Sequence, residues 1–167
     1  MHIRPATESD VPAILFIYNH ILNTSTAIYS NQPSTLEDRL AWFRTRTQAG
    51  YPVLVATIEQ QVVGFSTFGD FRYGSGYRFS VEHTVHLHPD HRGQGIGKQL
   101  LLALVPIAQG MGKHSMIGGI DAENAISIRL HESLGFERVA HLREIGYKFD
   151  RWLDLLLFQL RLEPTQP

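Results

Sequence analysis

Residues 91–100 read HRGQGIGKQL and come immediately before an apolar pattern of helical period. The glycines of this stretch are Gly93, Gly95 and Gly97. Positions without a side chain let a ligand approach the main chain, and the N–H groups at a helix start attract anions. Arg92 and Lys98 add positive charge beside them. The stretch therefore predicts a diphosphate-binding loop, with a glycine-softened helix start that binds nothing as the alternative.

Two familiar phosphate-binding motifs do not fit this loop. A P-loop needs a glycine five residues before Gly-Lys-Ser/Thr, whereas this chain has Arg92 there and Gln99 after the lysine. A dinucleotide fingerprint needs G-x-G-x-x-G, whereas residues 93–97 read G-x-G-x-G. The pattern that remains is Arg-x-x-Gly-x-Gly between a strand and a helix.

Outward from the loop, the hydrophobic periodicity predicts a mixed α/β sheet with helices on both sides. The expected strands are 2–6, 53–59, 62–71, 78–88, 114–121, 135–140 and 152–162, and the expected helices are 10–22, 36–49, 96–109 and 124–133. Ser34 and Glu37 form a capping box before the second helix. Pro106 predicts a kink or an early end of the third. The near-continuous apolar run at 152–162 indicates a strand buried on both faces.

Composition sets the class of protein. The chain has 167 residues, 43% of them apolar and 19% charged, and a net charge of −1. This length predicts one domain over 1–163 with a disordered tail at 164–167, and the low net charge argues against nucleic acid as a partner. No apolar run is long enough for a membrane partner, and the N-terminus lacks a signal peptide, so we expect a cytoplasmic protein. Because cysteine is absent, disulfides, thiolate metal sites and a cysteine nucleophile are excluded.

The loop also resembles the coenzyme A loop of the GNAT superfamily of N-acetyltransferases, Gln/Arg-x-x-Gly-x-Gly/Ala. A second segment, from Asn124 through Leu130-His131-Glu132-Ser133-Leu134-Gly135-Phe136, is similar to that family's Asn-x-x-Ala/Ser … Tyr-Glu-x-Leu-Gly-Phe. The order of predicted elements agrees over nearly the whole chain. The resemblance implies an α/β acyl-CoA N-acyltransferase fold with a mostly antiparallel central sheet, helices on both faces and a splayed parallel strand pair.

Further stretches resemble the phosphinothricin and methionine sulfoximine acetyltransferase group. They are Tyr18-Asn19-His20, Trp42-Phe43, Gly50-Tyr51-Pro52, Val81-Glu82-His83-Thr84-Val85 and Lys148-Phe149-Asp150-Arg151-Trp152-Leu153-Asp154. The resemblance implies acetyl transfer from acetyl-CoA to the α-amino group of a small amino acid, with detoxification as the result. It also implies a homodimer.

The resemblance assigns the co-substrate to a defined set of residues. Main-chain groups of Val85 and Leu87 would pair with the pantetheine arm and polarise the thioester carbonyl, and the glycine loop would bind the diphosphate. The full set is Val85, His86, Leu87, Arg92, Gly93, Gln94, Gly95, Ile96, Gly97, Lys98, Asn124 and Ser133.

Two side chains are candidates for proton transfer. Strand periodicity puts Glu82 on one face with Thr84 and His86, three residues before the expected thioester site, so Glu82 is the candidate general base. The alternative is a solvated carboxylate at a strand edge. His131 stands where many family members have a tyrosine acid, and it is either the proton donor to the thiolate or a partly buried helix residue.

The acceptor is expected to lie around the loop at 72–78. Arg72 and Arg78 flank this loop, and guanidinium groups bind carboxylates bidentately. The substrate-binding candidates are Arg72, Tyr73, Gly74, Arg78, Glu82, His83, Thr84 and Phe149, with Thr26 and Tyr29 as further pocket residues. Phe149 departs from the broader group, in which other members carry a histidine.

Other functions were weighed against this hypothesis. His83, His86, His88 and His91 with Asp90 suggest a metal site, but they lack the arrangement of a four-ligand centre, so no metal is expected. The functional alternatives are acetylation of protein N-termini or other small amines, and a non-catalytic acyl-CoA sensor.

Overall fold

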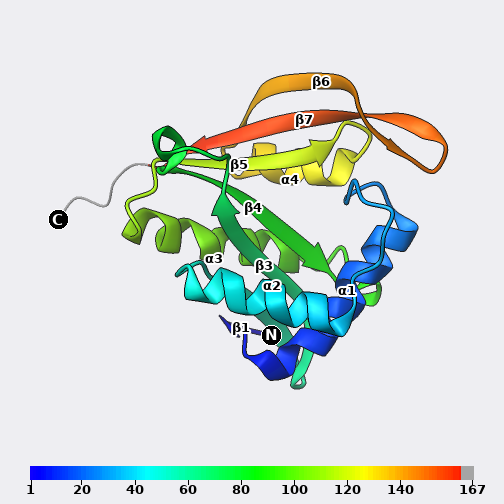
Figure 1. Cartoon of the computed structure of the whole chain (residues 1–167), viewed down its shortest axis with the longest axis vertical. Helices are drawn as coiled ribbons and strands as arrows, with labels where there is room; N and C mark the ends of the chain where they lie inside the picture. The colour runs from blue at the N-terminus through cyan, green and yellow to red at the C-terminus, as the bar shows by residue number, and fades with distance from the viewer. Residues whose placement is uncertain (163–167) are drawn as a thin grey trace.

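Seven strands form one sheet in the order β1-β2-β3-β4-β5-β7-β6, and helices cover both of its faces (Figure 1). The computed structural model describes residues 1–162, so the expected tail at 164–167 lies outside the described residues. The strands are β1 His2–Pro5, β2 Val53–Ile58, β3 Gln61–Asp70, β4 Ser80–Leu87, β5 Ser115–Asp121, β6 Glu137–Lys148 and β7 Arg151–Arg161. The helices are α1 Val11–Thr24, α2 Leu36–Gln48, α3 Ile96–Gly110 and α4 Ala125–Ser133.

Only β4 and β5 run parallel, and every other strand pair is antiparallel among the described residues. The expected order of elements and the mixed α/β class are confirmed. The hairpin predicted at 53–59 and 62–71 is β2–β3. No helix within residues 1–162 combines the length and apolarity needed to cross a bilayer.

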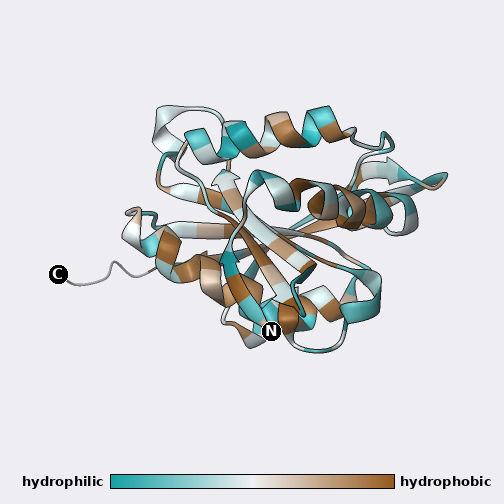
Figure 2. Cartoon of the chain, turned by 90° about the horizontal axis from the view of Figure 1, so that it is seen from below, coloured by the Kyte–Doolittle hydropathy of each residue, from teal (hydrophilic) through white to brown (hydrophobic). Residues whose placement is uncertain are grey.

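Alternating side chains build two hydrophobic cores, one on each face. Val53 and Val55 of β2 pack with α1, while Leu54 and Ala56 point to the opposite face and pack with α3. This alternation follows from the period of two in a strand. Figure 2 shows hydrophobic residues concentrated in the central strands and in the helices that flank them.

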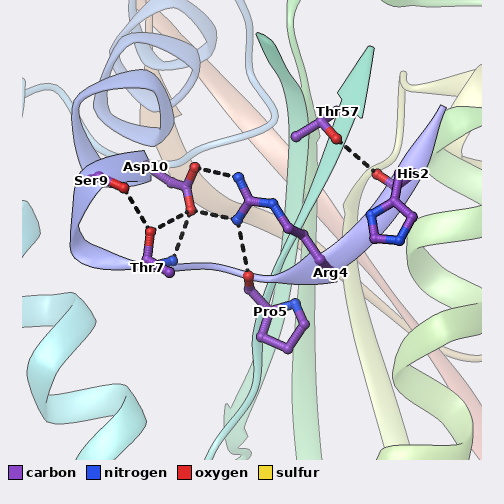
Figure 3. A network of polar contacts seen from close by, with 7 residues as sticks. All are labelled: His2, Arg4, Pro5, Thr7, Ser9, Asp10 and Thr57. Atoms are coloured by element: carbon purple, nitrogen blue, oxygen red, sulfur yellow. Dashed lines mark hydrogen bonds and ion pairs between the residues drawn. The ribbon is translucent and has the colours of Figure 1, made fainter. Parts of the chain in front are cut away.

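A polar network fixes the N-terminal edge of the sheet (Figure 3). Arg4 of β1 donates to both carboxylate oxygens of Asp10, at 2.7 and 2.8 Å. The same carboxylate accepts from the Thr7 N–H at 2.8 Å. Asp10 is buried, and its hydrogen bond from the Arg4 guanidinium lowers its pKa to about 2. Every oxygen of this carboxylate therefore has a partner within the chain.

The helix boundaries differ from the prediction at two points. The capping box lies one residue later than expected, because Thr35 accepts from the Asp38 N–H at 3.1 Å while Asp38 accepts from the Thr35 N–H at 3.0 Å. Both registers match the same spacing pattern. Of the two outcomes predicted at Pro106, the early end is wrong, because the third helix continues through Pro106 to Gly110.

The last two strands also differ from the prediction. β6 is twice the expected length. The prediction was too short because register shifts between Arg138 and Ala140 and between Leu142 and Gly146 break the period of two on which it depended. In β7, Leu156 and Phe158 are buried, whereas Leu155 on the other face is only half-buried. Both-face burial therefore fails here, since α1 and α2 pack against β2, β3 and β4 instead.

Candidate active site

A slot opens between the two parallel strands. β4 and β5 pair only from Ser80–Ser115 to Glu82–Ile117, and beyond this point neither strand has the other as a partner. The His88 N–H donates to the Val63 carbonyl of β3, at 2.8 Å. Because successive residues direct their backbone groups to opposite sides, the N–H groups of Val85 and Leu87 point away from β3, into the slot. The backbone N–H groups of Val85 and Leu87, the two residues predicted to polarise the thioester, therefore line the slot.

The glycine loop lies at the start of α3, next to the slot. Gly95 is the N-cap residue with φ 77°, and Gly93 has φ 75°, so both adopt the left-handed conformation that favours glycine. A Cβ at Gly97 would lie 3.5 Å from Leu87 and 3.9 Å from Val85. The loop therefore packs against the end of β4. The N–H groups in the first turn of α3 have no partners within the helix, as at any helix start.

The charged side chains of the loop are accessible. Arg92 and Lys98 are exposed, and neither forms an ion pair within residues 1–162. Unpaired cations beside free N–H groups suit a diphosphate. Gln94 is exposed as well, whereas Ile96 is buried in the core and contributes only its backbone to the loop.

The α4 candidates lie on the opposite side of the slot. The Asn124 side chain caps α4 by accepting from the Ser127 N–H at 3.0 Å, and its amide nitrogen makes no hydrogen bond within the described chain. Ser133 is exposed and donates to the Leu130 carbonyl at 2.8 Å. Asn124 thus keeps a donor for a ligand, while the Ser133 hydroxyl proton is already used.

Glu82 lies at the point where the parallel strands separate. Its carboxylate lies over Gly119, where an added Cβ would be 3.1 Å from Oε1. Partial burial raises the pKa of Glu82, and the nearby positive charge of Arg72 opposes this shift. The carboxylate makes no hydrogen bond or ion pair among residues 1–162. An unpartnered carboxylate of raised pKa has the properties of a general base.

His83, one residue later, points to the opposite face and is buried. Its Nε2 lies 3.0 Å from Nε2 of His131, and Nδ1 of His131 lies 2.7 Å from the Ser127 carbonyl. Since a carbonyl only accepts, His131 carries its proton on Nδ1, and His83 donates from Nε2. Burial lowers the pKa of both imidazoles, and their proximity adds to this shift at His83. The structure therefore separates His83 from the Glu82 face and leaves both nitrogens of His131 engaged.

Gly118 makes the histidine pair possible. A Cβ at this position would lie 2.7 Å from Nε2 of His83 and 3.0 Å from Nε2 of His131. Gly118 and Gly119 thus make room for side chains on opposite faces of β5. Sequence analysis missed both residues, although the Gly-Gly pair within the predicted strand was a visible signal, since glycine inside a strand often marks a close approach.

The other histidines do not form a metal centre. No group of three or more His, Asp or Glu side chains is arranged to hold a metal ion within residues 1–162. His86 shares the Glu82 face and packs against Phe65 and Tyr18. Its pKa is lowered to about 4, mainly by burial and further by the charges of Arg39 and Arg92.

The acceptor candidates are only partly brought together. Thr84 shares the Glu82 face, and Arg72 acts on Glu82 electrostatically. Arg78 donates instead to the Ser75 carbonyl of its own loop, at 3.0 Å. Tyr73 is fully exposed, and Gly74 has φ 112° in the same loop.

The remaining acceptor candidates lie at the end of β5 and at the β6–β7 hairpin. Phe149 lies in the tight turn between β6 and β7, with φ 51°, and it is exposed. The Tyr29 hydroxyl donates to the Asp154 carbonyl at 2.7 Å, and Thr26 donates to the buried Asp121. Phe149 and Tyr29 therefore belong to or contact the β6–β7 hairpin, whereas Thr26 bonds to a β5 residue on the same strand face as Gly119.

A hollow at the β1 edge is separate from this site. It has a volume of about 650 Å³ and is lined by Met1, His2, Arg4, Ser9, Asp10, Thr57, Glu59 and Gln60. None of these residues belongs to the slot or to the glycine loop.

Comparison with known proteins gives a consistent result. The model of the acetyltransferase (GNAT) family matches residues 15–136. An L-methionine sulfoximine/L-methionine sulfone acetyltransferase of Salmonella typhimurium is 46% identical, over 98% of this chain and 95% of that protein. A phosphinothricin N-acetyltransferase of Alcaligenes faecalis is 35% identical, over 94% of this chain and 80% of that protein.

A solved structure agrees with the arrangement of elements. The structure of yncA, a putative acetyltransferase from Salmonella typhimurium with its cofactor acetyl-CoA, superposes with a TM-score of 0.96. It is 45% identical and covers 100% of this chain and 96% of that one.

Proposed function

The chain belongs to the GNAT acetyltransferase family, and from this premise we propose that it transfers the acetyl group of acetyl-CoA to the α-amino group of a small amino acid. The substrate class we infer is that of methionine sulfoximine, methionine sulfone and phosphinothricin, and the consequence is detoxification. The observation that carries the proposal is the position of Glu82, an unpartnered carboxylate at the vertex of a slot that is edged by backbone donors.

The co-substrate has a matching set of protein groups. The first-turn N–H groups of α3, with Arg92 and Lys98, fit a diphosphate, and the slot between β4 and β5 fits the pantetheine arm. The N–H groups of Val85 and Leu87 would then face the thioester oxygen. Donors aimed at a developing oxyanion typically contribute about 3–4 kcal/mol to transition-state stabilisation.

Proton transfer is assigned to Glu82 alone. Glu82 accepts a proton from the acceptor ammonium and passes it to solvent, and the free amine attacks the thioester carbonyl. The C–S bond then breaks and releases coenzyme A as thiolate, while the new amide nitrogen gives up its second proton to Glu82. Because thiolate is a good leaving group, no side-chain acid is required. We therefore propose a positioning role for His131, which holds α4 against β4 through His83.

The remaining proposals concern the assembly and its location. We propose that residues 1–163 act as one domain, because a single sheet includes strands from both ends of the described chain. A homodimer is supported by exposed apolar side chains on the β6–β7 hairpin, namely Val139, Leu142, Ile145, Tyr147 and Trp152. Light scattering on the purified protein measures this directly. A cytoplasmic location follows from the proposed use of acetyl-CoA, a cytoplasmic metabolite.

The experiment that tests the function is an acceptor screen. Purified protein with acetyl-CoA is given a panel of amino acids, amines and N-terminal peptides, and thiol release is measured. We expect turnover with methionine sulfoximine, methionine sulfone or phosphinothricin. Turnover with peptides alone would instead indicate an N-terminal acetyltransferase. Binding of acetyl-CoA without turnover of any acceptor would indicate an acyl-CoA sensor.

A further inference from the structure

Two arginines on the sheet-facing side of α2 lack an anionic partner in the part of the chain that the structure describes. Arg39 is 7% exposed, lies 3.7 Å from the Tyr18 ring centroid, and has a buried Nε without a hydrogen bond. Arg46, two helical turns later, is half-buried and makes no hydrogen bond or ion pair within residues 1–162. Trp42 lies between them. Its ring centroid is 4.9 Å from the guanidinium carbon of Arg39 and 5.8 Å from that of Arg46. These cations are therefore held by aromatic rings and not by carboxylates.

A third arginine on the same helix shows the contrast. Arg44 is exposed and donates to both carboxylate oxygens of Glu8, at 2.7 and 2.8 Å. A surface arginine of α2 thus has a bidentate partner, while Arg46, which points toward the sheet, has none. Burial lowers the pKa of Arg46, because a desolvated cation without a hydrogen-bonded anion loses stabilisation.

The position of Arg46 relates it to Glu82. Its guanidinium lies over Gly69 of β3, where a Cβ would overlap Nη1. Gly69 is the register partner of Glu82, so the two residues face the same side of the sheet, with Cα atoms about 5 Å apart. The Glu82 carboxylate leans the other way, over Gly119 of β5. Arg46 and Glu82 therefore flank one position without pairing with each other.

The carboxylate of Asp70, whose charge acts on Arg46, does not bind the Arg46 guanidinium. Asp70 acts on Arg46 electrostatically, but it accepts its hydrogen bond from the Tyr51 hydroxyl and forms no ion pair with the arginine. Asp70 also follows Gly69 in β3, so its side chain points to the opposite face. Arg46 keeps its donors available on the Glu82 face.

We propose that Arg46 binds the α-carboxylate of the acceptor amino acid and thereby directs the α-amino group toward Glu82. The inference rests on the proposed function, because it requires an amino-acid acceptor. In an α-amino acid the carboxylate and the amine are attached to the same carbon. If that carbon lies between Arg46 and Glu82, the carboxylate can face the arginine while the amine faces the base. The planar guanidinium suits bidentate binding of a carboxylate. The site therefore selects acceptors in which a carboxylate lies next to the amine.

The test compares two acceptors with and without the arginine. For Arg46→Gln, we expect kcat/KM for L-methionine sulfoximine to fall by roughly 10- to 100-fold, the usual range for loss of a charged hydrogen bond. For the carboxamide of the same acceptor, the loss should stay below about threefold, because no carboxylate is there to lose its partner. Arg44→Gln is the matched control, since it removes a charge from the same helix and should change neither value.

A second variant displaces the guanidinium without removing its charge. In Gly69→Ala, the new Cβ overlaps only the flexible end of Arg46, so the protein should fold with nearly unchanged Tm. We expect KM for the amino acid to rise while KM for acetyl-CoA stays constant.

The possible outcomes separate the two proposals. An equal loss for the acid and its carboxamide in Arg46→Gln would overturn the assignment and make Arg46 a structural residue. Full activity of Arg46→Gln on the acid would overturn it as well. If the wild-type protein acetylates no amino acid in the screen, the proposed function itself fails, and the carboxylate site fails with it.

Discussion

The two faces of β4 carry polar side chains in opposite situations. On one face, neither the Glu82 carboxylate nor the nearby Arg46 guanidinium has a hydrogen-bond partner among residues 1–162. On the other face, His83 is buried and its Nε2 is bonded to His131, which is bonded in turn to the Ser127 carbonyl. Nδ1 of His83 has no hydrogen bond among residues 1–162. Buried polar groups that bond to each other support packing, whereas a carboxylate and a guanidinium without a protein partner are available to a ligand. From this difference we propose that the first face carries the chemistry and the second positions α4.

The largest expected effect is on kcat, from a substitution on the Glu82 face of β4. Glu82→Gln should lower kcat by about 100-fold or more, because a general base typically contributes a factor of that size. Since the pKa of Glu82 is raised, the wild-type acidic limb of kcat/KM should lie above the range where an ordinary glutamate titrates. The variant should lose this limb. Turnover measured by thiol release from pH 4 to 9 checks both points, and unchanged kcat would remove Glu82 from catalysis.

The adjacent glycines of β5 test the comparison most directly. Gly119→Ala pushes against the flexible carboxylate of Glu82, so kcat should fall by about tenfold while stability is nearly unchanged. Gly118→Ala pushes against two packed imidazoles, so the free energy of unfolding should fall by about 1–3 kcal/mol. Urea unfolding and thiol release on both variants measure the contrast. Equal effects of the two substitutions on stability would contradict the distinction between the faces.

The histidine pair decides between an acid and a positioning role. His131→Phe leaves the His83 N–H without an acceptor, and we expect a loss of about 1–3 kcal/mol in the free energy of unfolding. The double variant His83→Leu, His131→Phe should recover part of this loss, because both polar partners are gone. If His131 only positions α4, kcat should change by less than about threefold. A tenfold fall with loss of a basic limb in the pH profile would establish it as the acid.

The smallest expected effect concerns Asp10, whose carboxylate is paired with Arg4, unlike the unpaired carboxylate of Glu82. Arg4 lowers the pKa of Asp10 to about 2 in the folded state, below its ordinary value of 3.8. The stabilisation is therefore present above about pH 4 and is lost as the pH falls through 2. Asp10→Asn should cost about 1–2 kcal/mol at pH 7 and much less at pH 2, where the carboxylate is half protonated, after allowing for the partial exposure of Arg4. Thermal unfolding at both pH values, with exposed Glu132→Gln as the control, measures this.

Local patterns carried much of the prediction. The spacing of Arg92, Gly95 and Gly97 correctly placed a glycine loop at the start of a helix, and its binding of an anion stays a prediction. Period-two alternation correctly placed Glu82 and Thr84 on one face with His83 on the other. The predictions failed where the local pattern was ambiguous or broken. Two overlapping capping boxes match the sequence before α2, and bulges interrupt the alternation of β6, so neither boundary was fixed by nearby residues.

By itself, the sequence determined the order of elements, the glycine loop and the parity of β4, because each depends on residues a few positions apart. Only the tertiary structure decided which polar groups meet. It paired His83 with His131, 48 residues away, placed Arg46 over Gly69, and put Glu82 over Gly119. The physical reason is that a partner's distance and direction depend on strand register and helix packing, which no short stretch of sequence specifies.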